Sequence, residues 1–270
     1  MTLAPRQLVL LVLLTLTWGI NWPVMKIGVT EYPPLAFRAL SIWLGLPFVY
    51  LAARVMDQSL RIERRDWFEV MRLALTNMTV WHVVAIVAIQ ALSSGRAAIL
   101  GYTMPIFSAL WGRALFGERL SARQSLGVLA AAIGVALLLW HELAQMAGRP
   151  WAAMGMLAAA AVWALGTQQL RRTTLQVPTI TLVWWMLILS ALVLTVLTAT
   201  FERDRWAQPS PAAWGAILFN AVAIFGFAQM AWLVLARSLP PAASTLSVMM
   251  IPVLGAVSGA LWLGEALHWQ

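Results

Sequence analysis

The sequence contains no cysteine and few charged residues. The absence of cysteine from 270 residues excludes disulfide bonds, thiolate metal sites and cysteine nucleophiles. Charged side chains make up 10% of the chain, whereas a soluble domain carries roughly 25%. We therefore expect no separate soluble domain of any size.

Several nucleotide-binding and catalytic motifs are also missing. The chain has no Walker-type phosphate loop, so direct ATP coupling within it is not expected. It lacks HExxH, a paired histidine–acid cluster and Gly-x-Ser-x-Gly. The net charge of +8 comes from basic residues in short loops between apolar runs, where they orient membrane helices instead of binding nucleic acid. We predict a protein that is not an enzyme, with no cofactor and no bound metal.

Long apolar runs dominate the sequence. Hydrophobic residues make up 61% of the chain, and runs near the ~20 residues that cross a bilayer as a helix recur along its length. The first run has no convincing cleavage site after it, which favours a membrane helix over a signal peptide. We predict an all-α polytopic membrane protein with spans at residues 7–28, 34–54, 67–90, 96–117, 122–141, 151–170, 178–200, 211–235 and 241–263.

One pattern appears in the middle of the chain and again at its end. It consists of a proline within a span, then a glycine, then Gly-Glu-x-Leu. Shifting the sequence by 147 positions pairs Leu92, Pro105, Ala109, Gly112, Gly117, Glu118 and Leu120 with Leu239, Pro252, Ala256, Gly259, Gly264, Glu265 and Leu267. Internal repetition is typical of transporters built from two related halves. We predict a first repeat over residues 1–145 and a second over 146–270.

The repeat also predicts how many helices the fold has and how they are oriented. A further span, 122–141, follows the first copy, whereas little sequence follows the second, so we expect a tenth helix that this sequence does not include. Five helices per half give two inverted five-helix repeats, of which nine helices are visible. Arginines concentrate in the loops on the side of the N-terminus, which predicts a cytoplasmic N-terminus in a bacterial-type inner membrane.

Three motifs occur in a fixed order along the chain. They are Trp-Gly-Ile-Asn-Trp-Pro-Val-Met-Lys at 18–26, Pro-Pro-Leu-Ala-Phe-Arg at 33–38, and the stretch from Pro105 to Gly127 that contains Gly-Glu-Arg-Leu-Ser. Together they resemble EamA-type members of the drug/metabolite transporter superfamily. Within it the chain is most similar to the YddG-type exporters of aromatic and other amino acids. This resemblance implies a ten-helix inverted-repeat carrier that exports or exchanges small organic solutes.

A stripe of aromatic and polar residues lies along the first predicted span. Trp18, Asn21, Trp22, Met25 and Lys26 follow helical spacing and share one face. The aromatic rings would contact a substrate side chain, Asn21 would hydrogen-bond and Lys26 would bind a carboxylate. In the alternative interpretation, Trp22 belongs to an interfacial belt and Lys26 extends to the membrane surface. We select Trp18, Asn21 and Lys26 as candidate substrate-binding residues.

Other spans supply further candidates for substrate contact. His82 lies deep in a predicted span, one turn from Met78, and either binds substrate, changes its protonation or makes a packing hydrogen bond. Trp163 aligns with Trp18 at an offset of 145. The remaining candidates for substrate contact are Met78, Tyr102, Trp163 and Trp185.

The two repeated prolines are candidates for gating. Pro105 and Pro252 each free a backbone carbonyl and permit a bend, although membrane bundles also tolerate such prolines without a function.

Three charged side chains near helix ends are given structural roles. We interpret Glu118 and Glu265 as carboxylates that brace loops, close to Arg119 or Arg123, and not as proton carriers. Arg38 is expected near the outer membrane surface, as an anchor or as a gate partner of Glu31.

The resulting hypothesis is a secondary transporter that exports aromatic and other neutral amino acids and similar small metabolites by alternating access. No carboxylate is predicted in the middle of a span, which argues for a facilitative mechanism over an acidic proton relay. Two alternatives stay open: efflux of cationic drugs or metabolites, and proton-coupled exchange through His82. The expected partners are the small-molecule substrate and the lipid bilayer, and the oligomeric state is left open.

Overall fold

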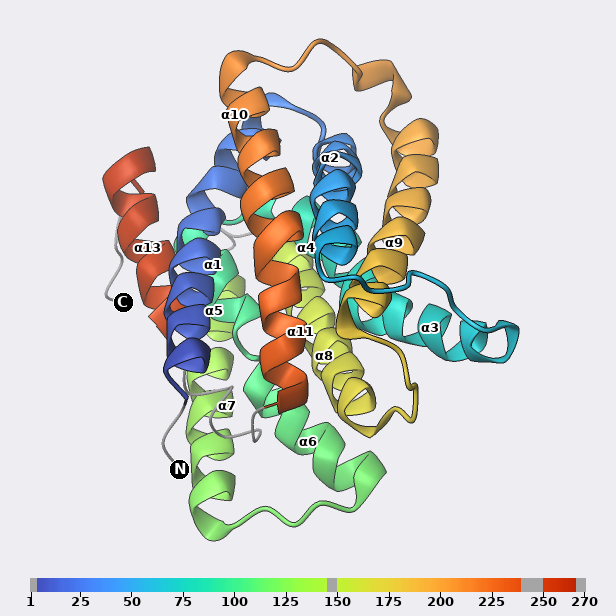
Figure 1. Ribbon diagram of the computed structural model, residues 1–270. Helices are drawn as coiled ribbons and strands as arrows, with labels where there is room; N and C mark the ends of the chain where they lie inside the picture. The colour runs from blue at the N-terminus through green and yellow to red at the C-terminus, as the bar shows by residue number, and fades with distance from the viewer. Residues whose placement is uncertain (1–3, 145–149, 239–249, 266–270) are drawn as a thin grey trace.

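The chain forms a bundle of helices that run alongside one another (Figure 1). The computed structural model describes residues 4–144, 150–238 and 250–265, and within these ranges it contains helices and no β-strand. The first part comprises α1 (Pro5–Glu31), α2 (Pro34–Val55), η1 (Arg64–Asp66), α3 (Trp67–Ala74), η2 (Leu75–Thr79), α4 (Val80–Ala91), α5 (Ser94–Gly101), α6 (Met104–Phe116) and α7 (Ala122–Ala144). The second comprises α8 (Pro150–Arg172), α9 (Thr179–Phe201), η3 (Arg203–Arg205), α10 (Pro211–Phe219), η4 (Asn220–Ala228), α11 (Gln229–Ser238) and α13 (Met250–Leu263).

Most predicted spans match these helices to within a few residues. Proline stands at the first position of α1, α2, α8 and α10. At this position a backbone N–H has no acceptor within the helix, so its absence in proline costs no hydrogen bond. The predicted ninth span, 241–263, is represented by α13, and its residues 241–249 lie outside the described residues. The predicted boundary between the two repeats also falls in a stretch, 145–149, outside the described residues.

The fourth predicted span, 96–117, is not one helix, and this prediction was wrong. The helix stops at Gly101, and α6 begins at Met104. The Thr103 hydroxyl donates to the Leu100 carbonyl at 2.7 Å. Pro105 therefore lies in the first turn of α6, where it begins a second helix instead of bending a continuous one. Pro252 is the third of the described residues of α13.

Two of the long spans contain a π-helical segment. In η2 the Val80 N–H donates to the Leu75 carbonyl, and in η4 the Gln229 N–H donates to the Ile224 carbonyl. A turn closed by such an i→i+5 hydrogen bond holds one residue more than an α-helical turn, and the helix continues on both sides of it. Each insertion changes which residues downstream share a face with those upstream.

Elements from both parts of the chain interleave in the bundle. In Figure 1, α1 lies beside α13, and α2 lies between α10 and α9. Similarly, α8 packs against both α4 and α6. A glycine permits one close approach: a methyl group at Gly45 of α2 would lie 2.9 Å from the Ala221 carbonyl oxygen of η4. Small residues at such crossings let membrane helices pack tightly.

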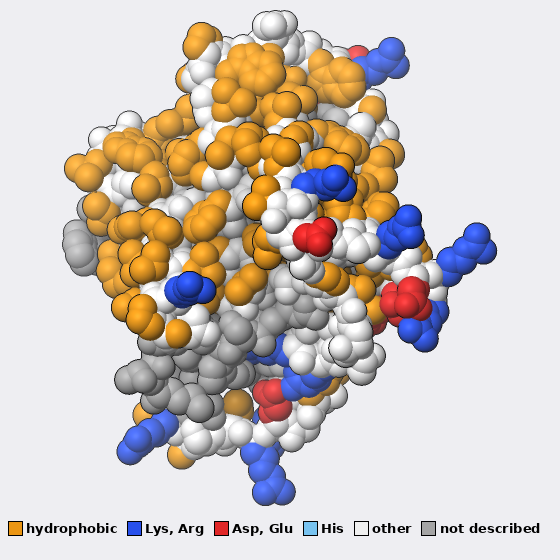
Figure 2. All heavy atoms as spheres, in the orientation of Figure 1, with side chains coloured by type: hydrophobic (Ala, Val, Ile, Leu, Met, Phe, Trp, Pro, Cys, Tyr) orange, Lys and Arg blue, Asp and Glu red, His pale blue; other side chains and the backbone are white. Residues whose placement is uncertain are grey.

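The outer surface of the bundle is apolar. Figure 2 shows hydrophobic side chains over most of one face, with most of the charged groups toward its lower end and right edge. Six helical stretches of the described chain are long and apolar enough to cross a membrane: 5–31, 34–55, 64–91, 150–172, 179–201 and 211–236. An apolar surface of this extent fits contact with lipid and not with water. The chain is a multi-pass membrane protein.

The two Gly-Glu repeats end their helices in the same way. Gly117 and Gly264 are left-handed, with φ of 67° and 65°, a conformation that favours glycine at a helix C-terminus. The following N–H of Glu118 donates to the Gly112 carbonyl at 2.9 Å, and that of Glu265 donates to the Gly259 carbonyl at 3.4 Å.

Both glutamate carboxylates brace a neighbouring helix end. Glu265 accepts hydrogen bonds from the Ser94 N–H at 2.9 Å and from the Ser94 hydroxyl at 3.1 Å. Glu118 pairs with Arg172 at the end of α8. The bracing role fits the prediction, but the partner of Glu118 is Arg172 and not the nearby Arg119 or Arg123.

Candidate functional site

A cavity lies inside the bundle between α1, α4, α8 and the span formed by α10, η4 and α11. We call it the central cavity. It is lined by Trp18, Asn21, Trp22, Met25, Arg38, Trp81, His82, Tyr102, Met104, Trp163, Ile224 and Gln229. Of the predicted substrate-binding residues, Trp18, Asn21, His82, Tyr102 and Trp163 lie at this cavity. Among the described residues that line it, none is acidic.

The stripe on α1 supplies one wall of the central cavity. Trp18, Asn21, Trp22 and Met25 all line it, as their shared helical face predicts. Asn21 and Trp22 are 5% and 4% exposed, so the interpretation of Trp22 as an interfacial belt residue was wrong.

Lys26, the last residue of the stripe, does not line the cavity. Its ammonium group donates to the carbonyl oxygens of Ile89, Gln90 and Leu92 at 3.0, 2.9 and 2.8 Å. These carbonyls belong to the C-terminal end of α4, which lacks further helical N–H partners. The geometry gives Lys26 a helix-capping role in place of the predicted contact with a substrate carboxylate.

The π-helical turn separates Met78 from His82. Met78 lies within η2, is 0% exposed and does not line the cavity. His82 follows η2, lines the cavity, and its Nε2 lies 3.2 Å from Gln229 Nε2. The predicted shared face assumed a regular α-helix, and the extra residue in the turn invalidates it for Met78.

Trp185 also lies away from the cavity. Its indole Nε1–H donates to the Leu60 carbonyl at 2.7 Å. Its ring packs edge-on against Trp67, with centroids 4.8 Å apart. Near the start of α9, Trp185 thus fixes the loop between α2 and α3 and does not contact the cavity.

Aromatic rings form much of the cavity lining. Trp163 packs edge-on against Trp18 and Trp81, with ring centroids 6.3 and 5.2 Å apart. Trp22 packs in the same way against Tyr102 at 6.5 Å. The two tryptophans that align between the repeats, Trp18 and Trp163, therefore meet in space. Such edge-to-face clusters are rigid, apolar surfaces for another ring or an aliphatic chain.

Arg38 is the cavity residue that sequence reasoning misplaced. It is 3% exposed and so does not lie at the outer surface. The predicted gate partner, Glu31, accepts a hydrogen bond from the Ser210 hydroxyl and does not pair with Arg38. Arg38 donates from Nη1 to Asn220 Oδ1 at 3.1 Å and from Nη2 to Met25 Sδ at 2.7 Å. The sequence signal was present, because Arg38 stands a full turn inside α2, and a charge within a membrane span marks a candidate functional site.

Several polar atoms around the central cavity lack a hydrogen-bond partner among the described residues. They are Arg38 Nε, Asn21 Oδ1, His82 Nδ1, Gln229 Oε1 and Trp163 Nε1. Buried polar groups are nearly always paired, so a cluster of unpaired ones needs an explanation such as water or a ligand. The cavity thus offers both donors and acceptors beside an apolar wall, an arrangement suited to a small molecule with polar and apolar parts.

Comparison with known proteins places this chain in a transport family. The model of the EamA-like transporter family matches residues 6–140 and 150–270. YoaV, an uncharacterized transporter of Bacillus subtilis, is 24% identical over 94% of this chain and 87% of its own length. YedA, an uncharacterized inner membrane transporter of Escherichia coli K12, is 28% identical over 94% of this chain and 82% of its own.

Two further similarities are less specific. A probable amino-acid metabolite efflux pump of Escherichia coli K12 is 28% identical over 58% of this chain and 51% of its own length. A solved crystal structure covers 96% of this chain and 90% of its own, with a TM-score of 0.70 at 19% identity. The latter likeness shows a shared fold alone. Because the family model matches nearly the whole chain, this multi-pass membrane protein belongs to the EamA-like transporter family.

Proposed function

We propose that this protein is a facilitative secondary transporter that exports aromatic and other neutral amino acids by alternating access. The two stretches matched by the family model would be its two inverted halves, with the N-terminus in the cytoplasm. The transport family and the partial relative described as a probable amino-acid metabolite efflux pump both support this proposal.

The buried guanidinium of Arg38 is the observation that carries the proposal. Its hydrogen-bond partners, Asn220 and Met25, are neutral, and its Nε lacks a partner among the described residues. A buried charge is costly unless an opposite charge compensates it. A substrate carboxylate would supply that charge and match the planar donor geometry of arginine.

The other cavity groups fit the remainder of an amino acid. Asn21 Oδ1 and Gln229 Oε1 are acceptors without partners among the described residues, so either can accept a hydrogen bond from an α-ammonium group. The tryptophan cluster around Trp163 provides an apolar surface for the side chain. An amino acid would therefore satisfy donors, acceptors and the apolar wall together.

Efflux of cations fits the cavity less well. No acidic residue lines the central cavity among the described residues, so a cationic substrate would find no counter-charge. It would also be repelled by Arg38; two like charges 4 Å apart cost about 4 kcal/mol at an effective dielectric constant of about 20.

Three irregular helical segments are the elements most suited to movement. The break between α5 and α6 lies next to Pro105, while η2 and η4 interrupt the α-helical hydrogen bonding of two other spans. We propose that the halves rock around the central cavity by bending at these points, with Pro105 at the start of one moving helix and Pro252 within another. Non-α backbone of this kind is tolerated in membranes where neighbouring protein or water satisfies it.

Transport into proteoliposomes tests the proposed function. Labelled phenylalanine and threonine should enter saturably, whereas phenethylamine, which lacks the carboxylate of phenylalanine, should not. Arg38→Gln should raise KM for phenylalanine by roughly tenfold to a hundredfold, since a hydrogen bond to a charged group contributes about 1.5–3 kcal/mol. Arg54→Gln, an exposed arginine on the same helix, is the matched control and should leave KM unchanged.

Two outcomes would contradict the proposal. The first is phenethylamine uptake by well-folded protein that does not transport amino acids. The second is amino-acid uptake with the same KM in Arg38→Gln and in Arg54→Gln.

A further inference from the structure

A second cavity adjoins the central cavity and extends toward the C-terminal end of α8. We call it the α8 vestibule. It is lined by Trp18, Tyr102, Met104, Pro105, Ser108, Trp163, Ala164, Thr167, Arg171 and Trp232. Trp18, Tyr102, Met104 and Trp163 line both cavities, so the two are neighbouring parts of one internal space.

A stripe on α8 leads through the vestibule. Trp163, Thr167 and Arg171 follow one another at intervals of four residues and therefore lie along one side of the helix. At a rise of about 1.5 Å per residue, Arg171 lies about 12 Å along the axis from Trp163. The stripe begins at the aromatic wall of the central cavity and ends with a cation in the last turn of the helix.

Three hydrogen-bond donors along the vestibule have no partner among the described residues. They are Thr167 Oγ1, Trp163 Nε1 and Trp232 Nε1. Their residues are 6%, 4% and 8% exposed, so bulk water does not satisfy these groups fully. Among the described residues the vestibule has no acidic lining residue. The vestibule therefore presents donors and a positive charge, which together suit an anion.

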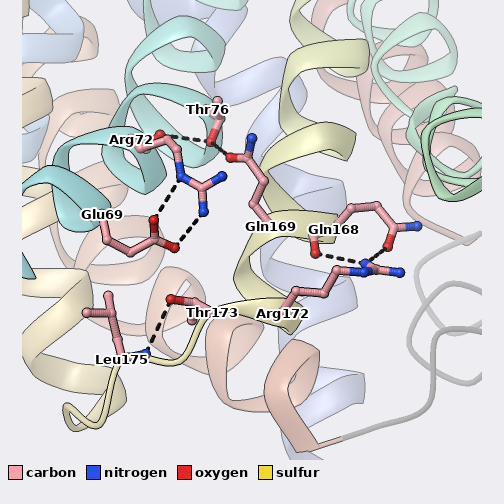
Figure 3. Close-up of polar contacts among 8 residues, drawn as sticks. All are labelled: Glu69, Arg72, Thr76, Gln168, Gln169, Arg172, Thr173 and Leu175. Carbon is pink, nitrogen blue, oxygen red and sulfur yellow. Dashed lines mark hydrogen bonds and ion pairs between the residues drawn. The ribbon is translucent and has the colours of Figure 1, made fainter. Parts of the chain in front are cut away.

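The polar residues beside this stripe are engaged with one another (Figure 3). Arg172 donates to the Gln168 carbonyl and side-chain oxygens at 2.9 and 2.5 Å, and it also pairs with Glu118. Gln169 Oε1 accepts from the Thr76 hydroxyl at 3.0 Å. Gln168 and Arg172 directly follow Thr167 and Arg171 in the chain, and Gln168 also donates to the carbonyl and hydroxyl oxygens of Ser108, which lines the vestibule.

The charges at this end of α8 leave an excess of positive charge. Glu118 attracts Arg171, and Arg172 repels it. Glu118 thus acts on both guanidinium groups, and these three described side chains carry a net charge of +1. A negatively charged molecule entering here therefore meets an attractive field, which persists over about 8 Å at physiological ionic strength.

We propose that the α8 vestibule is a second binding site for the carboxylate end of the transported molecule, with Arg171 as its anion-binding group. A molecule passing between the α8 end and the central cavity exchanges Arg171 for Arg38 as the partner of its carboxylate, while its apolar part stays against the shared tryptophans. This inference rests on the proposed function, since it assumes that the substrate carries a carboxylate.

Transport measured from each face separately tests the second site. In membrane vesicles of both orientations, Arg171→Gln should raise KM for phenylalanine about tenfold when substrate is supplied at the face where α8 ends, which is the lower estimate for a lost charge-assisted hydrogen bond. Arg171→Lys should raise this KM much less than Arg171→Gln, because lysine keeps the positive charge. Thr167→Val, which removes the hydroxyl without changing the charge, should raise the same KM less.

Two comparisons separate the second site from the central one. Arg113→Gln removes an exposed arginine of α6, and should leave KM unchanged at both faces. Equilibrium binding of phenylalanine to the purified protein should show a tighter phase that is weakened in Arg38→Gln and a weaker phase that is lost in Arg171→Gln.

The results that would overturn the second site differ from those that would overturn the proposed function. If wild-type protein transports phenylalanine and Arg171→Gln, confirmed as folded by size-exclusion chromatography, has an unchanged KM at the α8 face, the vestibule is not a binding site. An equal effect of Arg113→Gln would assign the change to surface charge and also exclude the site. If wild-type protein transports no molecule with a carboxylate, the proposed function fails and the second site with it.

Discussion

The Lys26 ammonium donates hydrogen bonds to three carbonyl oxygens at the end of α4. A cation in this position compensates both the unpaired carbonyls and the partial negative charge of a helix C-terminus. We expect Lys26→Met to lower the free energy of unfolding by about 1–3 kcal/mol while KM for phenylalanine stays unchanged. Thermal unfolding in detergent and uptake by the surviving folded protein measure the two effects.

Lys26→Arg is the control for this residue, because it keeps a cationic hydrogen-bond donor on a side chain of similar length. It should recover part of the lost stability. A Lys26→Met protein of normal stability with a raised KM would contradict the capping role and return Lys26 to the substrate site.

The contrast between Lys26 and Arg38 shows what sequence can predict at the residue scale. Helical spacing correctly grouped Trp18, Asn21 and Trp22 on one face, because that grouping depends on a single helix. Whether a cation on such a face meets a cavity or a neighbouring helix end depends on where other helices terminate. Arg38 was misplaced for the same reason, since its burial depends on η4, which lies 182 residues further along the chain at Asn220.

At the scale of elements, Glu265 connects the end of α13 to the beginning of α5. Its carboxylate accepts from the Ser94 N–H and hydroxyl, and so satisfies a donor of the first turn that has no helical partner. Glu118, its equivalent in the repeat, makes an ion pair whose side chains are 41% and 34% exposed. The same motif therefore makes a helix cap in one half and a partly exposed ion pair in the other.

This asymmetry predicts different costs for the same substitution. Glu265→Ala should lower the free energy of unfolding by about 0.5–2 kcal/mol, the range for loss of a helix N-terminal cap. Glu118→Ala should cost about 0–1 kcal/mol, as for an exposed ion pair. Thermal unfolding of both variants under the same conditions measures the difference, and equal or reversed losses would contradict this assignment of the two carboxylates.

The irregular parts of the helices were harder to predict than the helices themselves. Apolar run length predicts a membrane span because it depends on local composition. The π-helical segment η2 contains no proline or glycine, so composition gave no sign of it. Pro105 indicated an irregularity but not its position, because the helix already ends at Gly101. Gly101 packs against the rings of Trp22 and Trp81, which belong to other spans and are not close to it in the sequence.

At the scale of the whole molecule, the two cavities bring together residues that no sequence window contains. The central cavity combines the α1 stripe with Arg38 of α2, His82 of α4 and Gln229 of α11. The sequence repeat aligned Trp18 with Trp163, and these rings do meet, although the inverted relation of the halves stays a prediction. Composition and repetition thus indicated a carrier, while the buried charge of Arg38, which we propose binds the substrate carboxylate, became visible only when the helices were assembled.

The last prediction concerns energy coupling, which depends on every titratable group along the path. Among the described residues, neither cavity has an acidic lining residue, so a relay of carboxylates of the kind used by many proton-driven carriers is missing there. We therefore expect proteoliposomes with an imposed pH gradient to bring labelled phenylalanine to equal concentrations on both sides, with or without an ionophore that dissipates the gradient. Accumulation above equality would contradict facilitative transport. If His82→Gln then abolished accumulation but retained exchange, coupling would be assigned to His82, whose ring lines the central cavity and contacts Gln229, and the proton-coupled alternative would replace the facilitative one.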